Sequence, residues 1–320
     1  MFNISILLFI KKVYNIARFT KEEGYNVYAQ ITNYNLAIAK ENEKNIRIIM
    51  FSDIHFAEKY KLIKLKNIIK YANNNNPDYI CIPGDILDDS DVVKNHENRN
   101  ILLAWLKELS DVAKIIISVG NHDIMHIVDS EWQFQVNDEW FKDLSEISNV
   151  VLLQNSIYED KNIRFIGFNP SFSYYEKEKE NEITFLIELN TTFNKIIKND
   201  LLNIMLCHTP TNILNDLIID NSPCLKNIDV ILSGHIHGGL VPPLIDALWK
   251  CNKGFISPTG QLVPNLARGI MYKDGKVCIV STGITKLGYS TGLLEKLNSL
   301  FPMNINNIEI NSAEKIKRLQ

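Results

Sequence analysis

Apolar stretches of strand length alternate with amphipathic stretches of helical spacing along most of this chain. Strands are predicted at 46–52, 78–83, 114–119, 150–154, 163–168, 203–207, 229–233, 276–281 and 304–310. Helices are predicted at 59–72, 99–113, 130–147, 191–199 and 211–219. This alternation predicts an α/β fold (α+β in some schemes) in which two packed mixed β-sheets are flanked by helices.

The amino-terminal region predicts elements of a different kind. Apolar residues recur at helical spacing between Ile6 and Ala17, which favours a helix that packs on the domain; a helix on a membrane surface is the alternative. The apolar run at 2–10 is shorter than the roughly 20 residues of a membrane span and lacks a signal-peptide pattern. Residues 25–31 and 36–38 alternate in polarity, which predicts two strands in a hairpin. We therefore assign 1–24 to an amphipathic segment and 25–320 to one domain.

Two connections stand out by composition or length. Residues 169–182 are polar and charged, which predicts a surface loop. Residues 240–276 form a longer connection that contains apolar residues, and loops of that length inside a compact domain are usually functional.

The composition is that of a globular protein without affinity for polyanions. Of 320 residues, 46% are hydrophobic and 22% are charged, and the formal net charge is −3 without a basic cluster. A nucleic-acid partner is therefore not expected. The five cysteines are widely spaced and include no CxxC pair, which favours a reducing, cytoplasmic location. Peripheral contact with a membrane would involve residues 1–20.

Potential metal ligands follow several of the predicted strands. Five of the seven histidines lie in these short segments, which indicates one shared site rather than scattered surface residues. Buried neighbouring strands bring their carboxyl ends to one rim of a sheet, so the side chains should meet there. A set of seven oxygen and imidazole ligands exceeds the needs of one ion and suits two divalent ions about 3.5–4 Å apart. The candidates are Asp53, His55, Asp85, Asn121, His208, His235 and His237.

The order of these segments resembles the calcineurin-like metallophosphoesterase superfamily. The matching motifs are DIH (53–55), GDILDD (84–89), GNHD (120–123), the lone His208 and GHIHGG (234–239), within residues 46–283. The resemblance implies a four-layer sandwich of two sheets and two helix layers. The GHIHGG ending is similar to a bacterial branch that contains membrane-associated phosphodiesterases, although Leu240 stands where that branch has Gln.

The resemblance also implies a role for each site residue. Asp85 would bridge two metal ions, and His122 would protonate the leaving group while Asp123 orients its imidazole. Asp88 would act outside the ligand shell, and His96 and His126 would lie on the surface or beyond the ligands. The first ion would be held by Asp53, His55, Asp85 and His237, and the second by Asp85, Asn121, His208 and His235.

The implied activity is hydrolysis of a phosphate ester by a metal-bridging hydroxide, with Mn, Fe, Zn or Ni as the candidate ions. The expected substrate is a small-molecule phosphate ester, either a monoester or a diester. A lipid-linked pyrophosphate or diester near a membrane is an alternative, suggested by the apolar residues of 240–272. A nuclease of the same superfamily and a non-catalytic metal-binding scaffold are the other readings. The net charge disfavours the nuclease, and the complete ligand set disfavours the scaffold.

Overall fold

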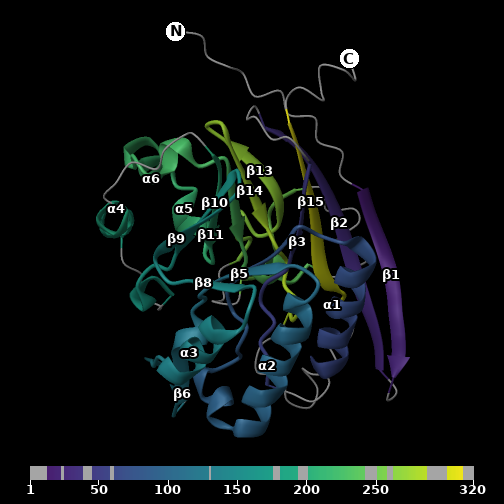
Figure 1. Ribbon diagram of the computed structural model, residues 1–320. Coiled ribbons are helices and arrows are strands. Elements are labelled where there is room, and N and C mark those ends of the chain that lie inside the picture. Colours follow the sequence, from purple (N-terminus) through teal and green to yellow (C-terminus); the bar gives the residue numbers. More distant parts are fainter. Residues whose placement is uncertain are drawn as a thin grey trace.

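In a computed structural model, two β-sheets pack face to face and helices cover the outer face of each (Figure 1). The α/β class and the four-layer arrangement predicted from the sequence are confirmed. No helix within the described residues has the length and apolar character needed to cross a membrane. The structure describes residues 13–22, 25–38, 45–57, 61–129, 131–175, 181–193, 201–241, 251–257, 262–286 and 301–312.

The larger sheet has seven strands in the order β1-β2-β15-β3-β4-β5-β8. Strands β3, β4, β5 and β8 run parallel, and β15 lies between β3, to which it is antiparallel, and β2, to which it is parallel. Helices α1 (Lys61–Asn75), α2 (His96–Ser110) and α3 (Asp138–Glu146) pack on the outer face. The strands are β1 (Val13–Glu22), β2 (Tyr25–Ile38), β15 (Met303–Ser312), β3 (Ile46–Met50), β4 (Tyr79–Pro83), β5 (Lys114–Ser118) and β8 (Val150–Leu153).

The smaller sheet has six strands in the order β13-β14-β12-β11-β10-β9, with four parallel strands inside and antiparallel strands at both edges. Short helices α4 (Glu182–Thr192), α5 (Pro210–Ile213) and α6 (Asp216–Asn221) cover its outer face. The strands are β13 (Gly269–Lys273), β14 (Lys276–Val280), β12 (Val230–Ser233), β11 (Leu202–Cys207), β10 (Ile163–Phe168) and β9 (Ser156–Asp160).

The sequence of the inner strands explains why they lie between two layers. Strands β4, β10, β11, β12 and β14 are buried along their whole length, as expected of strands covered on both faces. Met50, Ile116, Phe165 and Ile204 belong to the core between the two sheets. The parallel strands β3, β4, β5, β11 and β12 place the loops that follow them at one rim of the sandwich.

The structure corrects the predicted elements near the amino terminus. The helix predicted up to Ala17 is wrong from Val13 onward, because β1 pairs antiparallel with β2 at the edge of the larger sheet. Branched and aromatic residues such as Val13, Tyr14 and Ile16 favour such an extended edge. Residues 25–38 form one long strand rather than a hairpin. Residues 1–12 lie outside the described part of the chain, and the boundary between 24 and 25 stays a prediction.

Further elements differ from the predictions, among them the helix predicted at 211–219, which is divided into α5 and α6. The helix predicted at 130–147 is a strand, β7 (Glu131–Phe134), followed by α3, which begins after Asn137 because that side chain caps the amide of Trp140. The helix predicted at 191–199 begins earlier, as α4, and residues 194–200 lie outside the described part. The predicted surface loop at 169–182 contains a buried 3₁₀ turn, η3 (Phe172–Tyr175), whose aromatic rings pack inward; residues 176–180 are not described.

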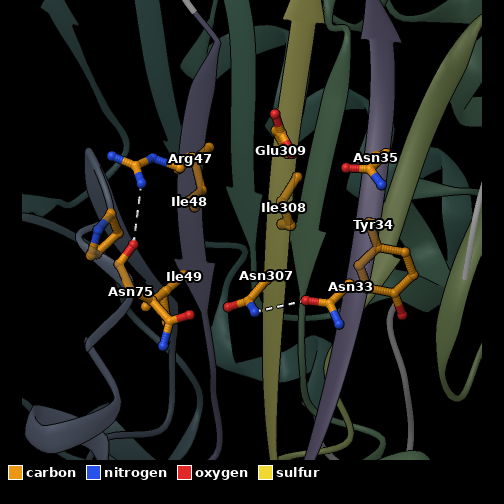
Figure 2. Close-up of a pocket in the computed structure, with 11 residues that line it drawn as sticks. Asn33, Tyr34, Asn35, Arg47, Ile48, Ile49, Asn75, Asn307, Ile308 and Glu309 are labelled. Carbon is orange, nitrogen blue, oxygen red and sulfur yellow. Dashed lines mark hydrogen bonds between the residues drawn. The ribbon is translucent and has the colours of Figure 1, made fainter. Parts of the chain in front are cut away.

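A polar cavity of about 250 Å³ lies at the amino-terminal end of β3, away from the rim where the predicted ligands lie. In Figure 2, Asn307 on β15 points toward Asn33 on β2, and Arg47 points toward Asn75 at the end of α1. The amide of Asn307 donates to Asn33 Oδ1 at 2.8 Å. None of the predicted metal ligands lines this cavity.

A polar contact joins the two sheets at the end where β5 begins. Lys114 Nζ donates to Tyr158 Oη at 2.6 Å and to Asp160 Oδ2 at 2.7 Å, both on β9. The hydrogen bond from Lys114 lowers the pKa of Asp160, although burial opposes it. Because the folded-state pKa lies below the ordinary value, this contribution to stability is present above about pH 4 and is lost as the pH falls through the lowered pKa.

We expect Lys114→Met to reduce the free energy of unfolding by about 0.5–1 kcal/mol at pH 7. The reduction should be smaller at pH 3, because the ion pair weakens as the pH falls toward the lowered pKa of Asp160. Urea unfolding at the two pH values measures it. Lys142→Met is the matched control, since Lys142 is exposed and lies 3.9 Å from Glu146 within one helix. An equal loss of stability at pH 3 and pH 7 would contradict the ionic origin of the effect.

Candidate metal centre

Five of the seven predicted ligands have a backbone conformation that non-glycine residues rarely adopt. The φ angles are 52° for Asp53, 48° for His55, 56° for Asp85, 71° for His235 and 50° for His237. A left-handed residue other than glycine costs on the order of 1–3 kcal/mol, and such strain concentrates at functional sites. Three separate loops therefore bend unfavourably at the positions from which these side chains extend.

The first group consists of Asp53, His55 and His237. His55 Nε2 lies 3.2 Å from His237 Nε2, and His237 Nε2 lies 3.5 Å from Asp53 Oδ1. One potential ligand atom from each residue falls within 4.8 Å of the others, and all three side chains are buried. This grouping suits one divalent ion.

The second group consists of Asp85, His208 and His235, again with ligand atoms within 4.8 Å of one another. His208 Nε2 lies 3.0 Å from Asp85 Oδ2, and the same carboxylate oxygen lies 3.7 Å from His55 Nε2 in the first group. Asp85 therefore lies between the two groups, where one carboxylate could be a ligand to an ion on either side.

Polar contacts at Nδ1 direct the Nε2 atoms of three histidines toward the centre. His237 Nδ1 lies 2.8 Å from the carbonyl oxygen of Thr285, and His208 Nδ1 lies 2.7 Å from that of Pro83. His55 Nδ1 lies 3.1 Å from Asp88 Oδ1. A carbonyl or carboxylate acceptor places the proton on Nδ1, which leaves the Nε2 lone pair for a metal ion. The facing Nε2 atoms of His55 and His237 then bring two lone pairs together, an arrangement that a cation between them would stabilise.

The side chain of Asn121 provides an independent test of whether the residues fit a metal. It is fully buried, and within the described part of the chain neither its oxygen nor its nitrogen makes a hydrogen bond. An amide left in this state costs about 1–3 kcal/mol, which coordination of its oxygen would offset. The donor set of carboxylates, imidazoles and one amide thus fits divalent ions.

Glycines allow the loops to approach one another at the centre. A Cβ atom at Gly120 would overlap Asp85 Oδ1, the oxygen that accepts the backbone N–H of His122 at 2.9 Å. A Cβ atom at Gly234 would lie 2.6 Å from Asp53 Oδ2. Any larger residue at these two positions would displace an expected ligand.

His122 lies beside the first group, with its ring centroid 4.5 Å from that of His55. The expectation that Asp123 orients this imidazole is wrong. His122 Nδ1 lies 2.6 Å from the backbone oxygen of Asp88, and the carboxylate of Asp123 instead accepts four backbone N–H groups at 2.8–3.0 Å. Asp123 therefore holds together the loops that follow β4 and β5. The four amides belong to Gly120, Asp85, Ile86 and Leu87.

A comparison of the sequence with known protein families agrees with this geometry. The family model for calcineurin-like phosphoesterases matches residues 46–239. The chain belongs to this family.

Relatives of this calcineurin-like phosphoesterase include a Caenorhabditis elegans protein named as a metallophosphoesterase, 25% identical over 67% of this chain and 41% of its own length. An uncharacterized metallophosphoesterase of Campylobacter jejuni is 23% identical over 67% of this chain and 50% of its own length. The chain thus spans about half the length of these curated relatives or less. A dimetal phosphatase of Danio rerio aligns over 74% of this chain and 87% of its own, with 11% identity and a TM-score of 0.41.

Electrostatics within the phosphoesterase centre favour bound cations. Burial would raise the pKa of Asp85, but the charges of His208 and His122 hold it well below the usual value. Although burial lowers the pKa of His208, the nearby Asp85 raises it to about 9. Burial lowers the pKa of His237 to about 4. The carboxylate that lies between the two groups is therefore ionised, and it attracts positive charge from either side.

Two basic side chains flank the centre on the His237 side. Arg268 and Lys286 are buried and line a narrow hollow together with His237. Lys286 Nζ donates to the carbonyl oxygen of Thr282. Burial lowers the pKa of Arg268 to about 10, and burial together with the Arg268 charge lowers the pKa of Lys286 well below its usual value. At neutral pH the guanidinium of Arg268 therefore adds positive potential next to the loop that carries GHIHGG.

The sequence did not indicate several residues that contact the centre. Thr285 accepts from His237 through its backbone oxygen and donates its hydroxyl to Ile54, and backbone contacts of this kind have no residue signature. Trp132 lies against His122, and the alternating pattern of EWQF could have shown the strand that carries it. Tyr175 lies against His235.

The two histidines outside the motifs lie where the sequence placed them. His96 is exposed at the start of α2, and His126 is half-buried on β6 (Met125–Val128).

Proposed function

We propose that this chain is a dinuclear-metal-dependent phosphoesterase that hydrolyses a small phosphate ester. The observation that carries the proposal is the pair of buried ligand groups with Asp85 between them. The first ion would be held by Asp53, His55, Asp85 and His237, and the second by Asp85, Asn121, His208 and His235.

The residues around the ions would have different roles in ester hydrolysis. Bound divalent ions supply a water of lowered pKa and neutralise charge on the phosphoryl oxygens. Asp85 and the histidines fix the ion positions, and the carboxylate of Asp123 fixes the loops that carry Asp85 and His122. His122 would give its proton to the leaving oxygen as the P–O bond breaks, and the contact between its Nδ1 and Asp88 holds the ring for this transfer. Burial lowers the pKa of His122, which makes its protonated form a stronger acid.

A substrate panel with metal-free and reconstituted protein tests this function. We expect no turnover after chelation, and turnover of aryl and alkyl phosphate esters after addition of Mn²⁺, Fe²⁺, Zn²⁺ or Ni²⁺. Metal content measured by mass spectrometry should approach two ions per chain. Two bound ions without hydrolysis of any monoester, diester or pyrophosphate would contradict the proposal and favour a binding role. Single-stranded DNA should bind weakly even at low salt, because the net charge of −3 provides no attraction.

A further inference from the structure

A two-stranded hairpin lies directly after the GNHD motif and places an aromatic ring against His122. It consists of β6 and β7, with Ile127 paired to Trp132. The ring centroid of Trp132 lies 5.6 Å from that of His122 in an edge-to-face arrangement with an interplanar angle of 64°. The Trp132 side chain is half-buried, so one part of it contacts the site and another remains accessible.

Aromatic residues from two separate segments extend this contact along the rim. Phe134 lies two residues after Trp132 and is 61% exposed. Its ring centroid lies 6.2 Å from that of Phe172 in η3. Tyr175, from the same turn, lies 5.0 Å from the ring of His235. The aromatic wall, as we call Trp132, Phe134, Phe172 and Tyr175, thus borders the centre from His122 to His235.

Polar contacts hold the hairpin in place. The backbone N–H of Ile127 donates to Asp89 Oδ2 at 2.9 Å. Gln135, just after β7, donates from Nε2 to Asp91 Oδ1 at 2.6 Å and from its backbone to the oxygen of Ile124 at 2.8 Å. Because these contacts are made within the chain itself, little ordering of the hairpin is needed when a ligand binds.

The position of His122 determines which part of the substrate would meet the aromatic wall. This inference rests on the proposed function, in which His122 protonates the leaving oxygen. A general acid must lie about 2.6–3.2 Å from the atom it protonates, so the leaving group has to extend past the His122 ring. Trp132 contacts the His122 ring, and Phe134 lies two residues further along the same strand.

We propose that Trp132 and Phe134 form a leaving-group subsite that selects phosphate esters of planar, ring-containing alcohols. Trp132 determines specificity by stacking on the ring, and Phe134 extends the contact toward solvent. Hydrolysis then breaks the P–O bond to the ring-bearing alcohol, joins a water oxygen to phosphorus and transfers a proton to the alcohol oxygen. The exposure of Phe134 follows from this role, since a ring in the subsite would cover it.

The test compares esters of benzyl alcohol, cyclohexylmethanol and ethanol, whose alkoxides are similar in basicity. With metal-loaded enzyme we expect Trp132→Ala to raise KM for the benzyl ester about fivefold to tenfold and for the ethyl ester less than twofold. Trp132→Phe should restore most of the benzyl preference. Tyr272→Ala, which removes a 52% exposed ring on β13, is the control and should leave KM for all three esters unchanged.

Three outcomes would overturn the proposal. Equal losses in kcat for all esters would make Trp132 a positioning residue for His122. Equal increases in KM for the benzyl and cyclohexylmethyl esters would exclude selection of planar rings. An unchanged benzyl KM would exclude any contact.

A binding measurement separates this inference from the proposed function. Benzylphosphonate, whose P–C bond is not hydrolysed, should bind the metal-loaded enzyme about fivefold to tenfold more tightly than ethylphosphonate by calorimetry, and Trp132→Ala should abolish the difference. Failure of all esters to react, with this difference intact, would reject the activity but keep the subsite. Equal binding of both phosphonates to the unaltered protein would reject the subsite.

Discussion

Replacing Asp85 by Asn should abolish hydrolysis, with a loss in kcat/KM on the order of 10³-fold or more. The amide keeps the shape of the side chain but removes the charge that lies 3.0 Å from His208 Nε2 and 3.7 Å from His55 Nε2. Without that charge the two groups have no shared anionic ligand. The bound metal should therefore fall from about two ions per chain to one or fewer, measured by mass spectrometry after equilibration with Mn²⁺.

Thermal unfolding of Asp85→Asn gives a readout that does not depend on catalysis. Ions that bind only the folded chain raise the free energy of unfolding by about 2.7 kcal/mol at a hundred times their Kd. We expect this gain for the unaltered protein and a much smaller one for the variant. Asp88→Asn should cost only about 10–100-fold in activity, because Asp88 acts through the His55 ring. The carboxylate of Asp216 is 82% exposed, and Asp216→Asn should change neither the activity nor the metal content. Two ions retained in Asp85→Asn would reject the bridging assignment.

Replacing His122 by Asn should lower kcat by about 10²–10⁴ for esters of poor leaving groups. An ethoxide requires a proton as it leaves, whereas a nitrophenolate requires much less help. The loss should therefore be several times smaller for a nitrophenyl ester than for an ethyl ester, and this ratio is the signature of a general acid.

Metal content decides whether His122 acts as an acid or as a ligand. His122 also forms a group with His55 and Asp85 whose ligand atoms lie within 4.8 Å of one another. If His122→Asn keeps two ions, its kinetic loss reflects the missing proton; if an ion is lost together with activity, the acid assignment fails. His126→Asn, in the adjacent strand β6, is the matched control and should retain both ions and full activity.

The strands that carry the site could be predicted because their local patterns are strong. The apolar runs of β3, β4 and β5 are short and bounded by polar residues, and each ends at a motif. The rim shared by parallel strands follows from the architecture, so the grouping of Asp53, Asp85 and His208 could be expected before any coordinates. Ligand assignment itself stays a proposal until ions are measured.

The features that could not be predicted depend on long-range pairing or on side-chain direction. No local pattern shows that β15 lies between β2 and β3, because the apolar residues of a strand indicate burial but not which strands are its neighbours. Asp123 adjoins His122 in sequence, but this adjacency does not place its carboxylate beside the imidazole. In the 3₁₀ turn that contains both, successive side chains point about a third of a turn apart, so neighbours in the chain face different partners.

The place of β15 has a consequence for how the protein is made. On the ribosome, β2 and β3 are synthesised long before β15, so their facing backbone edges stay unpaired until residues 303–312 emerge. Asn304 on β15 also bonds to Thr282 and Gly283, next to Thr285, whose carbonyl holds His237. Assembly of the centre thus depends on a strand that is synthesised after all of the expected ligands. A nascent chain stalled before residue 303 should retain chaperones and fail to take up two ions.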